Sequence, residues 1–204
     1  MPEAELDFRT ALAAQRGLPV LRHPDPAGAS ARVGELLAAG CRVVELTTST
    51  RDWAVALTDC VHIAAGRALI GVGTVTTAEQ AAAAIDGGAA FLVSPYPCPE
   101  VRATADDTGT LFLEGGFTPG EIAAAAARGP AKVFPAPVGG PAFVRSLLAV
   151  LPRAEQIPTG GVTRHDVADY LAAGAFAVGV GSGLPSDPAE LASVFNAKAA
   201  DPRA

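Results

Sequence analysis

The residue most informative about chemistry is a lysine inside an apolar segment. The chain has two lysines: Lys132 lies in the run Ala-Lys-Val-Phe-Pro at 131–135, and Lys198 lies in a predicted C-terminal helix, where a solvated lysine is ordinary. Burial favours the neutral amine, a nucleophile that can form a Schiff base with a carbonyl. The alternative is a strand-end lysine that reaches solvent or pairs with an acid. Arginine cannot form such an adduct, so the choice of lysine here indicates iminium chemistry.

A glutamate in a second apolar run is the candidate partner of this lysine. Glu45 follows two valines and precedes Leu46. In an interior shared with Lys132, its carboxylate could move protons as a general acid and base while the lysine holds the substrate. The structural alternative is that Glu45 only pairs with a basic side chain of the same interior. The residues alone do not decide between the two roles.

Two glycine-rich turns are candidates for binding an anion. Gly160-Gly161 and Gly181-Ser182-Gly183 each follow a predicted strand near the C-terminal part of the chain. Backbone N–H groups in such turns, facing a helix N-terminus, can hold a phosphate. Tight turns between strands and helices use glycine for conformational reasons as well, so each pair alone is also compatible with a turn that binds nothing.

Regular alternation of short apolar runs and Ala/Leu-rich stretches supplies the elements that would position these residues. It predicts a parallel sheet covered by helices, because strands buried on both faces are almost continuously hydrophobic. After an N-terminal helix at 3–16, the predicted strands are 18–22, 42–46, 68–73, 90–94, 110–114, 131–134, 156–158 and 175–180. The predicted helices between and after them are 28–39, 52–65, 77–87, 98–106, 118–128, 140–151, 163–173 and 188–199.

Eight strand–helix units predict an α/β fold, a (β/α)8 TIM barrel with an N-terminal helix, as a single domain over residues 1–204. The alternative is an open doubly wound sheet, which usually carries a G-x-G-x-x-G turn after its first strand. No such turn follows the run at 18–22. In a closed barrel the functional site lies at the C-terminal ends of the strands, which is where the lysine, the glutamate and the two glycine turns are expected.

Composition narrows the possible partners. Hydrophobic residues make up 50% of the chain, charged residues 18%, and the net charge is −6. An acidic chain does not favour nucleic acid, which requires a basic surface. The three cysteines and three histidines are scattered, so we expect no metal site and no cofactor. No apolar run reaches 18 residues and the N-terminus has no signal-like segment, so we expect a cytoplasmic protein without membrane association.

Six short motifs in order carry a resemblance to a known family. They are Val44-Glu45-Leu46-Thr47, Gly71-Val72-Gly73-Thr74-Val75, Val93-Ser94-Pro95, Lys132-Val133-Phe134-Pro135-Ala136, Pro158-Thr159-Gly160-Gly161-Val162 and Gly179-Val180-Gly181-Ser182. Together they resemble the 2-keto-3-deoxy-6-phosphogluconate (KDPG) / 4-hydroxy-2-oxoglutarate aldolase family over about residues 18–184. The resemblance implies a metal-independent class I aldolase, commonly a homotrimer. Its reaction would cleave a small-molecule 2-keto-4-hydroxy acid, with or without a phosphate, to pyruvate and an aldehyde.

The resemblance also implies a set of site residues. Lys132 would form the Schiff base, and Glu45 would be the general acid and base. The residues implied to bind the substrate are Thr74, Ser94, Pro95 and Phe134, and those implied to bind its phosphate are Gly160, Gly161, Gly181 and Ser182.

Three departures from the family pattern suggest a changed substrate pocket. Ser49 stands where the family usually has an arginine that binds the keto-acid carboxylate, and Arg22 or Arg51 could replace it. Glu114 stands in place of a proline, and we expect its carboxylate beside Lys132, where it would repel the substrate anion and hold the amine protonated. Tyr96 stands in place of a glycine. These departures predict a poor KDPG aldolase.

Three other interpretations remain open at this point. The departures could be neutral drift around an unchanged reaction. The chain could be a diverged lyase or isomerase that uses the same iminium on another substrate. It could also be a ligand-binding barrel without catalytic activity.

Overall fold

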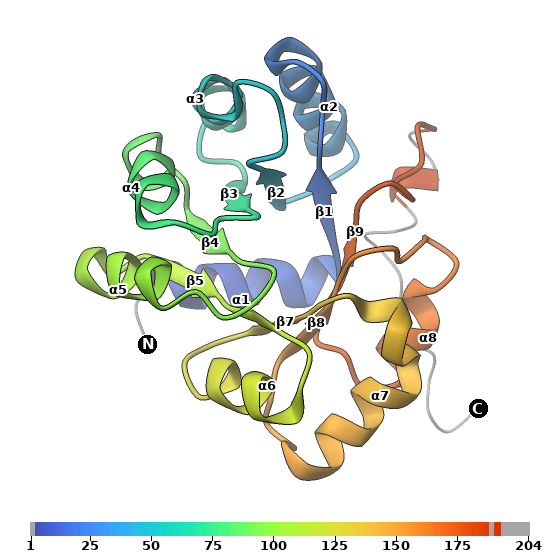
Figure 1. Ribbon diagram of the computed structural model, residues 1–204. Helices are drawn as coiled ribbons and strands as arrows, with labels where there is room; N and C mark the ends of the chain where they lie inside the picture. The colour runs from blue at the N-terminus through green and yellow to red at the C-terminus, as the bar shows by residue number, and fades with distance from the viewer. Residues whose placement is uncertain (1–2, 188–189, 193–204) are drawn as a thin grey trace.

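Short strands alternate with helices throughout the computed structural model, which describes residues 3–187 and 190–192 (Figure 1). The helices are α1 (Glu3–Gln15), α2 (Pro26–Ala38), α3 (Trp53–Ala64), α4 (Ala78–Asp86), α5 (Pro99–Thr108), α6 (Pro119–Ala126), α7 (Ala136–Val150) and α8 (Val167–Ala172). The strands are β1 (Gly17–Leu21), β2 (Val43–Thr47), β3 (Leu69–Gly73), β4 (Phe91–Val93), β5 (Leu111–Leu113), β6 (Gly115–Gly116), β7 (Ala131–Val133), β8 (Gln156–Pro158) and β9 (Val178–Val180).

The predicted elements up to residue 180 are confirmed, with bounds that differ by a few residues. The predicted strand at 110–114 is divided at Glu114 into β5 and β6. The helix predicted over 188–199 lies mostly outside the described residues, of which 190–192 are helical. Among the described residues, no helix is long and apolar enough to cross a membrane.

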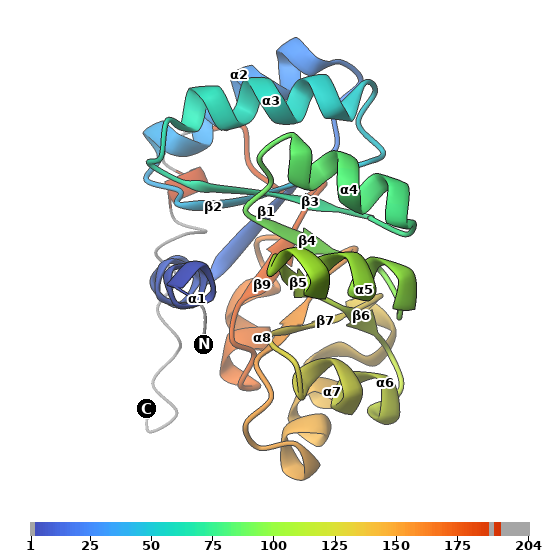
Figure 2. The same cartoon turned by 90° about the vertical axis from the view of Figure 1, so that its left-hand side faces the viewer.

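The strands are parallel and form two sections. One section has the order β5-β4-β3-β2-β1-β9 and the other β6-β7-β8. Glu114 alone separates β5 from β6, and an isolated parallel bridge pairs Thr159, just after β8, with Gly179 in β9. The prediction of an α/β fold with a parallel sheet is therefore confirmed. Figures 1 and 2 show the helices α2 to α8 on the outer side of this curved sheet.

Apolar side chains pack on both faces of the sheet, because successive residues of a strand point to opposite sides. The outer face packs against the surrounding helices, as Val44 and Leu46 of β2 do with Leu57 of α3 in one cluster. The inner face carries a second cluster that includes Val43 of β2 and Phe91 of β4.

Helix α1 covers the N-terminal ends of the strands. Phe8 and Leu12 of α1 are almost fully buried in the inner cluster, and the Phe8 ring meets the Phe91 ring edge-on at 4.8 Å. At the end of α1 the buried Gln15 amide donates to the carbonyl oxygens of Gly17 and Val43, and its oxygen accepts from the Val43 N–H. These bonds satisfy a buried polar group and fix the helix against β1 and β2.

Candidate active site

Lys132 and Glu45 meet inside the curve of the sheet. Lys132 Nζ lies 3.4 Å from Glu45 Oε1, and both residues are buried, at 5% and 0% exposed. Lys132 is the middle residue of β7, and its neighbours Ala131 and Val133 pack outward against α6 and α7. Strand alternation therefore turns the lysine side chain inward, toward β2.

Glycine at position 73 makes room for the glutamate. A Cβ at Gly73 would lie 1.8 Å from Glu45 Oε1, so any larger residue would displace the carboxylate. Glu45 Oε2 and the hydroxyl of Thr47 are buried and have no hydrogen-bond partner among the described residues. Glu45 and Thr47 are two residues apart on β2 and share its inner face. Their free oxygens are available to hydrogen bond with a molecule bound beside Lys132.

A cavity of about 1180 Å³ opens around this pair. Most of the predicted site residues line it, namely Arg22, Glu45, Thr74, Pro95, Lys132, Phe134, Gly160, Gly161, Gly181 and Ser182. They come from the C-terminal ends of the strands and the turns that follow them. The Phe134 ring centroid lies 5.6 Å from Lys132 Nζ, so the face of an aromatic ring is next to a nitrogen that carries positive charge when protonated or in an iminium.

The two glycine turns lie side by side at one edge of this cavity. Parallel bridges pair Thr159 with Gly179 and Thr163 with Gly183, one before and one after the turns. Gly160 and Gly161 have φ of +87° and +73°, a region that favours glycine. A Cβ on Gly160 would also lie 2.4 Å from the Phe134 ring. Backbone geometry and close packing thus both require these glycines, whether or not they hold an anion.

Thr74 lines the cavity with its backbone in the left-handed region, at φ +61°. This conformation is uncommon for residues other than glycine and costs about 1–3 kcal/mol. The Thr48 hydroxyl donates to the Thr74 carbonyl at 2.8 Å and helps to hold it. A strained residue held at the end of β3 fits the predicted substrate-binding role of Thr74.

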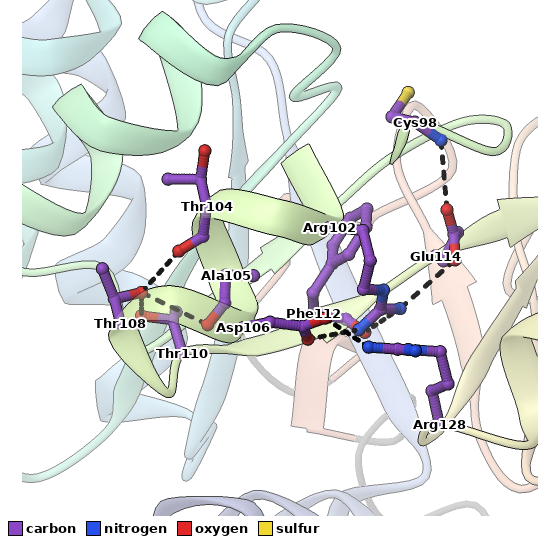
Figure 3. Close-up of polar contacts among 10 residues, drawn as sticks. All are labelled: Cys98, Arg102, Thr104, Ala105, Asp106, Thr108, Thr110, Phe112, Glu114 and Arg128. Carbon is purple, nitrogen blue, oxygen red and sulfur yellow. Dashed lines mark hydrogen bonds and ion pairs between the residues drawn. The ribbon is translucent and has the colours of Figure 1, made fainter. Parts of the chain in front are cut away.

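The prediction that Glu114 lies beside Lys132 in the cavity is wrong. Its backbone carbonyl accepts from the Lys132 N–H, but its side chain points outward, where Oε2 lies 3.3 Å from Arg102 Nη2 and Oε1 accepts from the Cys98 N–H (Figure 3). Strand alternation explains the direction, since Leu113 and Gly115 on either side occupy the inner face. Glu114 therefore does not place a second carboxylate next to the amine.

Two further predicted substrate-binding residues do not reach the cavity either. The Ser94 hydroxyl donates to the Tyr96 carbonyl and accepts from the Gly115 N–H, so it stabilises the loop after β4. Ser49 is exposed and is absent from the cavity lining. Of the two arginines expected to replace the missing one, Arg22 lines the cavity and Arg51 does not.

The cavity wall also contains six polar residues to which the sequence analysis gave no role, namely His23, Arg32, Glu35, Thr47, Thr159 and Ser186. Thr47 and Thr159 were predictable, since each lies two residues after a residue on the inner face. Arg32 belongs to α2, and no strand-end rule identifies it. His23 follows β1, and its ring lies so close to α2 that a Cβ at Gly28 would meet it at 1.7 Å.

The three cysteines are buried, and their thiols are not placed to act as nucleophiles. Burial raises the pKa of Cys41 to about 12 and that of Cys60 to about 11, so both thiols stay protonated at neutral pH. Within residues 3–187 and 190–192, no group of three or more histidines, cysteines, aspartates or glutamates is placed to hold a metal ion.

Comparison with known proteins identifies the family of this chain. The protein-family model described as KDPG and KHG aldolase matches residues 9–194. The chain belongs to the KDPG and KHG aldolase family. It is 38% identical to a probable 2-dehydro-3-deoxy-6-phosphogalactonate aldolase of Rhizobium meliloti (strain 1021), over 81% of this chain and 79% of the relative. It is 33% identical to the 2-dehydro-3-deoxy-6-phosphogalactonate aldolase of Escherichia coli (strain K12), over 81% of this chain and 82% of the relative.

A solved structure bears on the chemistry. It is a KDPG aldolase from Legionella pneumophila with pyruvate captured at low pH as a covalent carbinolamine intermediate. This chain is 25% identical to it, with a TM-score of 0.77, over 92% of this chain and 96% of that one. The prediction that the KDPG/KHG-like chain is a class I aldolase, and hence a lyase, is therefore confirmed.

Proposed function

We propose that this aldolase cleaves 2-dehydro-3-deoxy-6-phosphogalactonate to pyruvate and glyceraldehyde 3-phosphate. The observation that carries the proposal is the buried contact of 3.4 Å between Lys132 Nζ and Glu45 Oε1 in the wall of a substrate-sized cavity. The galactonate epimer is favoured over KDPG because the Rhizobium meliloti and Escherichia coli relatives named as galactonate aldolases are 38% and 33% identical over 79% and 82% of their length, whereas a phosphogluconate aldolase matched over 81% of its length is 29% identical.

The reaction begins at the lysine. Lys132 gives a proton to Glu45, and the neutral Nζ attacks the keto carbon C2 of the substrate to form a carbinolamine. Glu45 returns the proton to the C2 hydroxyl, which leaves as water, and the iminium forms. The Phe134 ring, 5.6 Å from Nζ, favours this cation through its π face.

Carbon–carbon cleavage uses the same two residues. Glu45 takes the proton from the C4 hydroxyl, the C3–C4 bond breaks, and its electron pair moves into the enamine while the aldehyde leaves. The enamine takes this proton back from Glu45 at C3 and becomes the pyruvate iminium, and Glu45 is again a carboxylate. Water then adds at C2, and the C–N bond breaks to release pyruvate and restore Lys132. No oxidant or metal is needed for this sequence to balance.

The two charged ends of the substrate are assigned to different residues of the cavity lining. The carboxylate is assigned to Arg22 and Thr74, since Arg22 lines the cavity and Ser49 is not in its lining. The phosphate is assigned to the backbone N–H groups of the turns at 160–161 and 181–182, which lie beside each other in the cavity lining.

Several broader expectations belong to the same proposal. We infer that the two sheet sections form one closed (β/α)8 barrel in a single domain, supported by the one-residue gap at Glu114 and the bridge between Thr159 and Gly179. We also infer a homotrimer in the cytoplasm, as the family resemblance implies. Light scattering on purified protein tests the trimer, and a monomeric mass would contradict it.

The choice of epimer has a direct test. KDPG and its galactonate counterpart differ only in configuration at C4, so their kcat/KM values can be compared under identical conditions by coupling pyruvate release to lactate dehydrogenase. We expect the galactonate epimer to be preferred. If KDPG is cleaved with kcat/KM above about 10⁵ M⁻¹s⁻¹ and is the better substrate, the proposed preference is wrong and the departures are drift.

A further inference from the structure

We propose that Glu114 is a positioning residue for the reaction at Lys132: its carboxylate fastens the β4–α5 loop, which carries Pro95 into the cavity, onto the strand beside the lysine. The inference rests on the proposed role of Lys132 as the nucleophile. It assigns a use to a carboxylate that the mechanism above leaves outside the cavity.

Residue 114 contacts the lysine strand through its backbone. The Glu114 carbonyl accepts from the Lys132 N–H at 3.1 Å, and the next residue, Gly115, is paired in register with Lys132. A shift of the chain at 114 would therefore shift the backbone that aims the Lys132 amine.

The carboxylate of Glu114 holds the start of α5. Its Oε1 accepts from the Cys98 N–H at 3.1 Å, and Cys98 is the N-cap residue of α5 without a side-chain cap of its own. Helix α6 shows the usual solution, in which Glu121 of the same helix accepts from the N-cap N–H of Thr118. From its place between β5 and β6, Glu114 does for α5 what the glutamate of a capping box does within one helix.

An arginine holds this carboxylate in place. Arg102 Nη2 lies 3.3 Å from Glu114 Oε2, with the two side chains 14% and 12% exposed, and the guanidinium stacks 4.4 Å from the Phe112 ring centroid (Figure 3). Charge pairs with so little water around them are held tightly when both partners are present, and removal of one leaves the other poorly solvated.

The loop between β4 and α5 is packed and hydrogen bonded against Gly115, so a shift at Cys98 is transmitted along the loop. The Ser94 hydroxyl accepts from the Gly115 N–H at 3.1 Å and donates to the Tyr96 carbonyl at 2.7 Å. A Cβ on Gly115 would lie 2.4 Å from the Pro95 carbonyl carbon, so the loop backbone rests directly on the strand. Releasing Cys98 from Glu114 therefore moves Pro95, a wall of the cavity.

The first test is Glu114→Ala, assayed for turnover and for the rate at which pyruvate and borohydride trap Lys132. We expect both rates to fall by roughly 10- to 100-fold, the effect of misplacing reacting groups by about 1 Å. The inhibition constant for inorganic phosphate should stay at its wild-type value, because the turns at 160–161 and 181–182 follow other strands, β8 and β9. Arg128→Gln is the matched control: Arg128 pairs with Asp106 at the exposed end of the same network and should leave both rates unchanged.

The second test separates positioning from stability. In Arg102→Leu/Glu114→Leu the largely buried ion pair is replaced by apolar side chains, a change that often restores stability. We expect its Tm to recover toward wild type while the trapping rate stays low, since no carboxylate holds Cys98. This variant carries the test alone if Glu114→Ala does not fold.

Two results would overturn the inference: wild-type trapping rates in Glu114→Ala, or a double variant whose rate recovers together with its Tm. Failure of the wild-type protein to be trapped on Lys132 at all would instead overturn the proposed function.

Discussion

The two ends of the interior enclosed by the strands have opposite chemistry. The N-terminal end is filled by Phe8, Phe91 and their neighbours, and the buried Gln15 side chain at the end of α1 has its amide groups hydrogen bonded. The C-terminal end holds Lys132 and Glu45 together with carboxylate and hydroxyl oxygens that have no partner among the described residues.

The same strands build both ends. On β2, Val43 packs into the apolar end, and Glu45, two residues further, faces the lysine. Two residues on the same face of one strand thus have different roles: Val43 contributes to stability, and Glu45 is suited to catalysis. Substitutions at the apolar end should therefore reduce stability with little effect on rate, and substitutions at the polar end should do the reverse.

The largest expected effect is at the polar end. Glu45→Gln keeps the shape and one hydrogen bond to Lys132 but cannot move protons, so kcat should fall by roughly 10²–10⁴-fold. The Tm should stay near the wild-type value. Steady-state kinetics and a thermal melt check both statements, and a variant with normal kcat would leave Glu45 a structural ion-pair partner.

At the apolar end, Phe8→Ala should cost about 3–5 kcal/mol of unfolding free energy, because it opens a cavity under a nearly fully buried ring. We expect kcat of the folded protein, measured well below its Tm, to match wild type. Denaturant unfolding provides the energy. Thr10→Ala, at an exposed position of the same helix, should change it by less than about 0.5 kcal/mol. A large loss of kcat in Phe8→Ala would show that the two ends are coupled.

A smaller effect is expected at the anion turns. Gly161→Val adds bulk 3.0 Å from Pro137 and strains a backbone with φ +73°. A hydrogen bond to a charged group contributes about 1.5–3 kcal/mol, so loss of one should raise KM for the phosphorylated substrate about tenfold or more. KM for an unphosphorylated 2-keto-4-hydroxy acid should not change. Gly40→Val, at φ +90° with open space around it, controls for backbone strain. Equal effects on both substrates would mean that the glycines serve only the turn.

The smallest expected effect concerns stability beside these turns. Hydrogen bonds from the Thr163 side chain and backbone hold the pKa of Asp166 below its usual value. Because the folded pKa is lowered, this stabilisation is present above the unfolded pKa of about 3.9 and is lost as pH falls through the folded pKa. Asp166→Asn should thus lower Tm at pH 7, and the difference from wild type should shrink below about pH 4. A difference in Tm between wild type and Asp166→Asn that stays constant from pH 7 to strongly acidic pH would contradict this account.

Much of this arrangement was predictable from residue patterns, and the exceptions have physical causes. Lys132 was identified because a charged residue within an apolar run needs a reason to be buried, and the glycine turns because they end strands. The direction of Glu114 was mispredicted because neighbouring strands were considered without the alternation of side chains along each one. His23 and Arg32 reach the cavity from a loop and a helix whose tilt no local pattern records.

The central claim is that Lys132 forms the covalent adduct, and trapping tests it most directly. Wild-type protein is incubated with pyruvate and borohydride, digested, and analysed by mass spectrometry, with Lys132→Met as the matched variant. We predict that the reduced pyruvate adduct is found on the peptide that contains Lys132, and that Lys132→Met folds but has neither adduct nor turnover. Trapping on Lys198 alone, or no adduct with any 2-keto acid, would contradict the account.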